Sequence, residues 1–215
     1  MAEHDDRPEL IERHDDRDRF LHWLLTIAFA FAATSGLALF HPGFFWLSAL
    51  TGGGPWTAIL HPFIGLVMAA AFFAFALPHW KINRIGPNDV AWLKGMRHVV
   101  AGREDLLPEA GKYNAGQKLL YYTLLVAMAV LTVTGFLFWR RYFAGGFPVG
   151  VVRVSALLHA FFAFVLLMGI VVHVSAAVWA QGSITAMIRG KVTLGWAYKH
   201  HRAWFREMIR SASSR

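Results

Sequence analysis

Four uncharged apolar runs constrain the fold of this chain more than any other feature. They cover residues 20–40, 60–80, 119–139 and 154–180, and each is bounded by charged residues, Pro or Gly. A hydrocarbon core about 30 Å thick requires about 20 apolar residues in a helix. The chain lacks the strand alternation of an outer-membrane barrel, so helices are needed to satisfy the backbone inside lipid. The sequence therefore predicts an all-α integral membrane protein, a four-helix transmembrane bundle forming one domain over 1–215.

Composition supports this class and excludes several kinds of site. Hydrophobic residues make up 56% of the 215 residues and aromatic residues 15%, which is high for a domain that faces water. The absence of cysteine excludes disulfides, thiolate zinc sites, covalently attached c-type haem and an iron–sulfur cluster bound by this chain alone. The formal charge of +8 lies in the segments that flank the apolar runs, so we expect no nucleic-acid partner.

Lysine and arginine are distributed unequally over the connecting segments. Residues 41–59 contain neither, and residues 140–153 contain three arginines. Residues 81–118 contain seven Lys and Arg residues, four arginines precede the first run, and seven Lys and Arg residues follow the last. By the positive-inside rule, both termini and the middle segment are predicted to be cytoplasmic. The chain is then a multi-pass protein of the bacterial cytoplasmic (inner) membrane.

The two ends of the chain are predicted to be polar cytoplasmic segments. Residues 1–19 alternate acidic and basic side chains and lack the apolar stretch and cleavage site of a secretory signal peptide. We expect a solvated tail or surface helix without chemistry there. Residues 181–215 form the basic C-terminal segment.

Four histidines in the apolar runs form the candidate functional site. His22 opens the first run on the cytoplasmic side, His61 opens the second on the opposite side, and the fourth run contains His159 and His173. These last two are 14 positions apart, which is about 21 Å of helical rise and a return to within about 40° of the same azimuth. The depths predict two pairs, His61 with His159 and His22 with His173. Two bis-histidine b-type haems fit this pattern and would serve electron transfer.

Glycines in the same runs are predicted to make room for the flat macrocycles. They are Gly36, Gly65, Gly135 and Gly169. Glycine is also common in membrane helices for close packing alone, so the glycines support the haem interpretation and do not carry it. A single histidine at a helix mouth can likewise be an interfacial residue, and that interpretation is preferred for the others, which lie in loops, belts or the basic tail: His41, His79, His98, His200 and His201.

These residues resemble the gamma, or cytochrome b, subunit of respiratory membrane-bound formate dehydrogenase. The motifs that carry the resemblance are RFLHW at 19–23, LHPFIG at 60–65, GKYNAGQK at 111–118, and LH at 158–159 followed by His173. It covers nearly the whole chain, except the acidic and basic start and the run of glycines at 52–54.

The resemblance implies a cofactor and partner set. The gamma subunit of that family anchors an iron–sulfur beta subunit, which receives electrons from a molybdenum- or tungsten-pterin alpha subunit outside the cytoplasmic membrane. His61 and His159 would ligate an outer haem b, and His22 and His173 an inner haem b. Formate oxidation itself would take place on the partner chain, so no catalytic residue is assigned here, and the complex could form a higher oligomer.

The family also implies a menaquinone- or ubiquinone-type site beside the inner haem. Asn114 and Gln117 map onto this site, in the vicinity of His173. Their amides could hydrogen-bond a quinone carbonyl, although Gly, Asn and basic residues at this position also cap and anchor a membrane helix.

Two other functions remain open at this stage. One is the cytochrome b subunit of a membrane-bound hydrogenase or related respiratory oxidoreductase. The other is a transporter with a histidine proton relay. The apolar runs contain no Asp, Glu, Lys or Arg and no obvious central Pro interruption, which gives a substrate path little support.

Overall fold

The computed structural model describes residues 10–103 and 106–213 and is mainly helical. Residues 1–9 of the expected polar N-terminal segment and residues 214–215 of the basic C-terminal segment lie outside the described residues. In chain order the elements are β1 Leu10–Glu12, α1 Asp16–Phe40, η1 Pro42–Thr51, α2 Gly54–Ala76, η2 Leu77–His79, α3 Pro87–Lys94, α4 Met96–Val100, α5 Ala115–Phe138, η4 Ala144–Gly146, α6 Val149–Trp179, α7 Ser183–Arg189, β2 Lys191–Thr193, α8 Leu194–His200 and α9 Arg202–Ser213.

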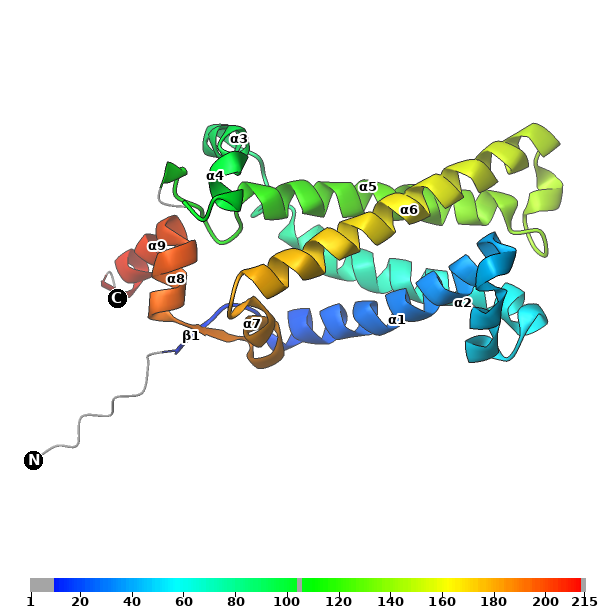
Figure 1. Ribbon diagram of the computed structural model, residues 1–215, viewed down its shortest axis with the longest axis horizontal. Coiled ribbons are helices and arrows are strands. Elements are labelled where there is room, and N and C mark those ends of the chain that lie inside the picture. The colour runs from blue at the N-terminus through cyan, green and yellow to red at the C-terminus, as the bar shows by residue number, and fades with distance from the viewer. Residues whose placement is uncertain (1–9, 104–105, 214–215) are drawn as a thin grey trace, which may run out of the picture. The chain divides into compact units, whose positions relative to one another are not determined.

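Four of these helices contain the four predicted spans. In the described residues, α1, α2 with η2, α5 and α6 are the helices long and apolar enough to cross a membrane, and they are the long ribbons in Figure 1. α1 begins where the side chain of Asp15 accepts a hydrogen bond from the backbone N–H of Asp18 (2.7 Å), an arrangement typical of a helix N-cap. The predicted all-α membrane protein with four spans is confirmed.

The chain divides into two compact units. Residues 20–78 and 122–175 form the first, here called the transmembrane unit. The second, here called the terminal unit, comprises the described parts of residues 1–19, 79–121 and 176–215.

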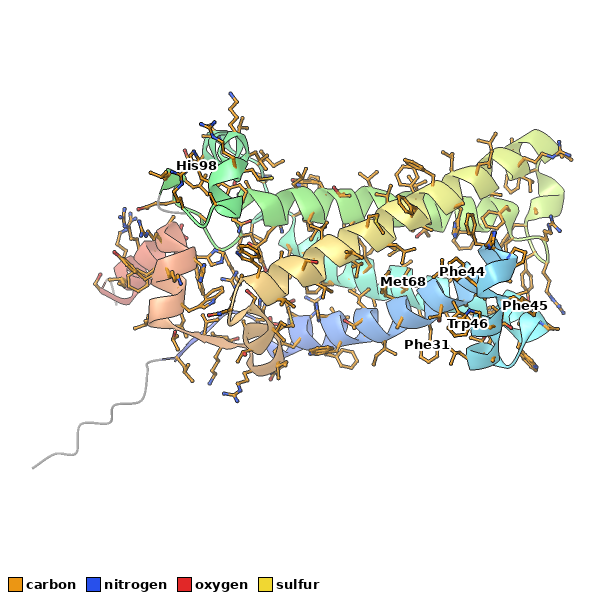
Figure 2. All side chains as sticks on the ribbon, viewed as in Figure 1. Phe31, Phe44, Phe45, Trp46, Met68 and His98 are labelled. Atoms are coloured by element: carbon orange, nitrogen blue, oxygen red, sulfur yellow. The ribbon has the colours of Figure 1, made fainter. Side chains whose placement is uncertain are left out.

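The transmembrane unit exposes large apolar side chains on its outside. Phe31 is 46% exposed on α1, and Phe44, Phe45 and Trp46 on η1 are exposed as well, whereas Met68 on α2 is buried; these residues are labelled in Figure 2. The buried positions are largely small residues, which let membrane helices approach closely: Ala28, Ala32, Ser35, Ala69, Ala71 and Ala127. A surface this apolar is costly to expose to water and is suited to contact with lipid.

The terminal unit contains a small sheet that the sequence did not predict. β1 and β2 pair in antiparallel register, with Leu10 opposite Thr193 and Glu12 opposite Lys191. Each strand has three residues, which is too short to give a pattern of alternation. The pairing joins the segment before α1 to the segment after α7, and β2 contributes Val192 to a small core with Ala186, Ala197 and Trp204.

Arg13 is the buried centre of the terminal unit, which corrects two expectations. It is 4% exposed although a solvated tail or surface helix was expected there, and His201 is 3% exposed although an interfacial histidine was expected. The Arg13 guanidinium lies against the rings of Trp196 and Trp204, at 4.8 and 5.2 Å from their centroids. Stacking on aromatic rings lets a long cationic side chain be covered, and neither charge alternation nor composition reveals such distant contacts.

Hydrogen bonds connect this centre to the segment before α5. Arg13 donates to the backbone oxygen of Lys112 (3.0 Å) and lies 3.1 Å from His201 Nε2. His201 Nδ1 lies 2.7 Å from the backbone oxygen of Gly111. Because a carbonyl only accepts, Nδ1 carries the proton, and Nε2 then accepts from Arg13. Burial first, and the Arg13 charge second, lower the pKa of His201 to about 3, so the ring is neutral at physiological pH.

This arrangement predicts that the terminal unit loosens in acid. The unfolded chain would take up a proton on His201 near pH 6.5, while the folded chain resists it down to about pH 3. Stability is therefore complete above about pH 6.5 and falls by about 1.4 kcal/mol per pH unit below it. Hydrogen–deuterium exchange of α8 and α9, corrected for the intrinsic rate, should accelerate between pH 6.5 and 5. The H201Q variant should flatten this profile, whereas H200Q should change it much less, because His200 is the smallest of the causes that shift the pKa of His201.

Candidate functional site

The transmembrane unit brings four histidines together as two pairs. The rings of His61 on α2 and His159 on α6 have centroids 6.3 Å apart. Those of His22 on α1 and His173 on α6 lie 6.2 Å apart. In the described residues, no group of three or more His, Cys, Asp or Glu could hold a metal ion, so pairing is the arrangement that the structure offers. These are the pairs that helical depth predicted from the sequence.

The spacing of the rings suits two axial ligands of one iron. An imidazole nitrogen binds a first-row metal ion at about 2.0–2.1 Å, so two rings on opposite sides of one metal have centroids about 6 Å apart. Both measured separations agree with this value. A histidine pair without further protein ligands is the donor set of a low-spin haem, and it leaves no open position for substrate chemistry.

Two hydroxyl groups that the sequence analysis missed hold the rings of the first pair. Ser35 Oγ on α1 lies 2.9 Å from His61 Nδ1, and Thr134 Oγ1 on α5 lies 3.1 Å from His159 Nδ1. A hydrogen bond on one ring nitrogen orients the ring and presents the other nitrogen to a metal. The sequence pattern that could have indicated these hydroxyl contacts is a Ser or Thr directly before a glycine in two apolar runs, at Ser35-Gly36 and Thr134-Gly135.

The glycines after these hydroxyls lie against the same histidines. A Cβ on Gly36 would lie 3.2 Å from His61 Cε1, and one on Gly135 would lie 3.5 Å from His159 Cε1. Both glycines therefore leave room for a histidine ring. No atom lies within 4 Å of a Cβ placed on Gly65, and Gly169 is buried within α6.

Gly36 is accordingly predicted to tolerate no branched side chain. A G36L substitution would push the His61 ring from its position, and overpacking of this kind costs about 1–3 kcal/mol. We expect haem at the His61 and His159 pair to bind about 5- to 150-fold more weakly, while haem at the other pair is retained. Haem content of the purified chain and its visible spectrum measure this. G150L is the matched control, because no atom lies within 4 Å of a Cβ at Gly150 on α6; equal haem loss in both variants would contradict the prediction.

Asn114 and Gln117 lie in the terminal unit and form a reciprocal cap at the start of α5. Asn114 Oδ1 accepts from the backbone N–H of Gln117, and Gln117 Oε1 accepts from the backbone N–H of Asn114, both at 2.9 Å. This is the arrangement of a capping box. The helix-start interpretation of the run is therefore part of its role, and it uses the amide oxygens of both side chains.

The rest of the run from 111 to 118 is also held in place. Gly111 and Lys112 accept hydrogen bonds from His201 and Arg13, and Lys118 Nζ lies 2.8 Å from Asp89 Oδ2 in a half-buried ion pair. Burial raises the pKa of Tyr113 to about 12, so the phenol stays protonated. A segment fixed at this many points is preorganised, as a binding site requires.

Two of the remaining histidines have local roles in the structure. His41 Nδ1 accepts from the backbone N–H of Gly43 (3.0 Å) and caps η1. His79 Nε2 lies 3.0 Å from Asp18 Oδ2, within the terminal unit.

Comparison with known proteins matches this geometry to a family. Residues 13–190 match the family described as prokaryotic cytochrome b561. The chain belongs to this family of membrane cytochromes. It is 43% identical to the formate dehydrogenase cytochrome b556 subunit of Haemophilus influenzae over 94% of the chain and 84% of that protein. It is 38% identical to the cytochrome b556(fdo) subunit of Escherichia coli K12 over 97% of the chain and 98% of that protein.

A further relative is the nitrate-inducible formate dehydrogenase cytochrome b556(Fdn) subunit of E. coli K12, at 37% identity over 97% of the chain and 96% of that protein. The resemblance to the cytochrome b subunit of formate dehydrogenase, predicted from the motifs, is confirmed. The chain is thus a membrane haem protein of electron transfer, in a family of subunits of oxidoreductase complexes.

Proposed function

We propose that the chain is the di-haem cytochrome b subunit of a respiratory formate dehydrogenase. In this role it passes electrons from an iron–sulfur partner subunit, served by a molybdenum- or tungsten-pterin subunit, to quinone in the bacterial inner membrane. The observation that carries the proposal is the presence of two histidine pairs, at centroid separations of 6.2 and 6.3 Å. Two pairs support a proposal of two haem sites, and the separation of His159 and His173 on one helix would hold these sites at two levels.

Each residue of the site has a defined task in this proposal. His61 with His159, and His22 with His173, would each hold one haem b. Haem bound by these histidines would supply one-electron transfer. The buried small residues of the helices let them approach closely.

The orientation supports entry of electrons on one side and exit on the other. By the positive-inside rule, the segment from Arg140 to Arg153 faces the outside, and both termini face the cytoplasm. A pocket of about 410 Å³ on this segment is lined by Arg140 and Arg153 together with Phe147. Cationic groups at a pocket edge suit acidic side chains of a partner, so this surface is proposed to contact the iron–sulfur subunit.

Hydrogenase and transporter functions fit less well. The three relatives described above carry the name formate dehydrogenase at 37–43% identity, which favours formate over hydrogen as the donor. A proton relay would require histidines linked in a chain across the membrane, whereas these four meet as two separate pairs.

Isolation of the tagged complex tests the proposal. We expect two haems b per chain, a low-spin reduced-minus-oxidised spectrum, co-purifying iron–sulfur and pterin subunits, and reduction of both haems by formate but not by hydrogen. Added quinone should reoxidise them. One haem per intact chain would contradict the di-haem assignment, and reduction by hydrogen alone would replace formate dehydrogenase with hydrogenase.

A further inference from the structure

Ser35 and Thr134 make equivalent contacts to the two histidines of one pair. Ser35 lies 26 positions before His61, and Thr134 lies 25 positions before His159. Each hydroxyl approaches the Nδ1 atom of its histidine, and each is followed by the glycine that faces the same ring. The contact thus occurs twice, between α1 and α2 and between α5 and α6.

The remaining bonds of the hydroxyls determine the direction of these contacts. Ser35 Oγ lies 2.6 Å from the backbone oxygen of Phe31, and Thr134 Oγ1 lies 2.6 Å from that of Val130. A carbonyl oxygen only accepts, so the single hydroxyl hydrogen is donated along the helix. The hydroxyl oxygen must then accept from the histidine. Nδ1 therefore carries the hydrogen in His61 and His159, and Nε2 presents a lone pair.

The second pair lacks this support at His22. Among the described residues, His22 Nδ1 is buried without a hydrogen-bond partner. A hydrogen bond from Nδ1–H to an acceptor increases the electron density of the imidazole and makes the opposite nitrogen a stronger donor to iron. A stronger donor stabilises ferric over ferrous iron, and hydrogen bonding around the ligands is one of the means by which a protein sets haem potential.

We infer that Ser35 and Thr134 are positioning residues that fix the tautomer of His61 and His159 and lower the reduction potential of the haem held by that pair below that of the haem held by His22 and His173. The inference rests on the proposed haem ligation and adds an order of reduction potential between the two haem sites. Electron transfer toward the His22 and His173 pair is then favourable, in the direction that the proposed quinone reduction requires.

Redox titration of the purified complex tests this order. Two spectral waves are expected, and the lower one should be lost in H61A and the higher one in H173A. S35A and T134V should each raise the lower wave and leave the higher wave in place. A tenfold increase in the ratio of reduced to oxidised haem at fixed potential, which is 59 mV for a one-electron couple, is the size expected for the double variant. S35T and T134S keep the hydroxyl and should restore the native potential.

Two neighbouring threonines provide matched controls. Thr34 and Thr132 donate to the carbonyls of Ala30 and Met128 at 2.8 Å, as Ser35 and Thr134 do to theirs, and neither contacts a ligand histidine among the contacts described. T34V and T132V should leave both waves unchanged. If both waves keep their potentials in S35A and T134V, or if the control variants shift the lower wave equally, this inference is wrong while the di-haem assignment stands. A single wave in the native complex would overturn the di-haem assignment and this inference together.

Discussion

Replacement of a paired histidine with alanine is expected to remove one haem and leave the other. H61A and H159A should lose the same haem, since these rings face each other at 6.3 Å. H22A and H173A should lose the other, because the rings of His22 and His173 have centroids 6.2 Å apart. Without one of its two histidines, a pair can no longer form a bis-histidine site. Haem content should therefore fall from two per chain to one. Pyridine haemochrome analysis and the split of the low-temperature α-band measure this loss.

The pairing makes this prediction specific. H200A is the matched control, because His200 lies on α8 and belongs to the terminal unit rather than to the transmembrane unit that contains both pairs, and it should retain two haems. Loss of different haems in H61A and H159A would show that the pairing is wrong. Equal loss in H200A would show that haem content follows stability rather than ligation.

The sequence predicted the transmembrane helices and the histidine pairs for related reasons. A membrane span has a required length and a required absence of charge, so uncharged runs locate helices without knowledge of their neighbours. The regular rise and rotation of a helix then relate His159 to His173 through their spacing alone. Depth along the span indicated which other histidine each would meet, because all four helices cross the same layer.

Contacts that depend on side-chain direction between distant segments could not be predicted in this way. A serine or threonine in a membrane helix commonly bonds to its own backbone, so Ser35 and Thr134 showed nothing unusual until the rings of His61 and His159 were placed beside them. Arg13 was expected to be solvated because its neighbours are charged. Its burial depends on aromatic rings of the C-terminal segment, which lie far away along the chain.

The largest effect on quinone reduction is expected from the amide nitrogens of Asn114 and Gln117. Their amide oxygens already accept the backbone N–H groups of the capping box, so the NH₂ groups are the parts that could donate to a quinone carbonyl. N114D and Q117E keep the capping oxygens and the side-chain volume but replace both donors with acceptors. Each lost donor costs about 1 kcal/mol and repulsion adds to this, so the double variant should raise the KM for quinone roughly tenfold to a hundredfold.

The same variant should leave the other steps unchanged. Both haems and their reduction by formate should be retained, because the substitutions preserve the start of α5, and only reoxidation by quinone should slow. N88D is the control for each single substitution, since it adds one negative charge, as N114D or Q117E alone does, at an exposed position of α3 in the terminal unit. Alanine at positions 114 and 117 would be less informative, because loss of a cap alone costs about 0.5–2 kcal/mol. If reoxidation by quinone in N114D with Q117E equals that of N88D, the quinone binds elsewhere, and the run from 111 to 118 serves to start and anchor the helix.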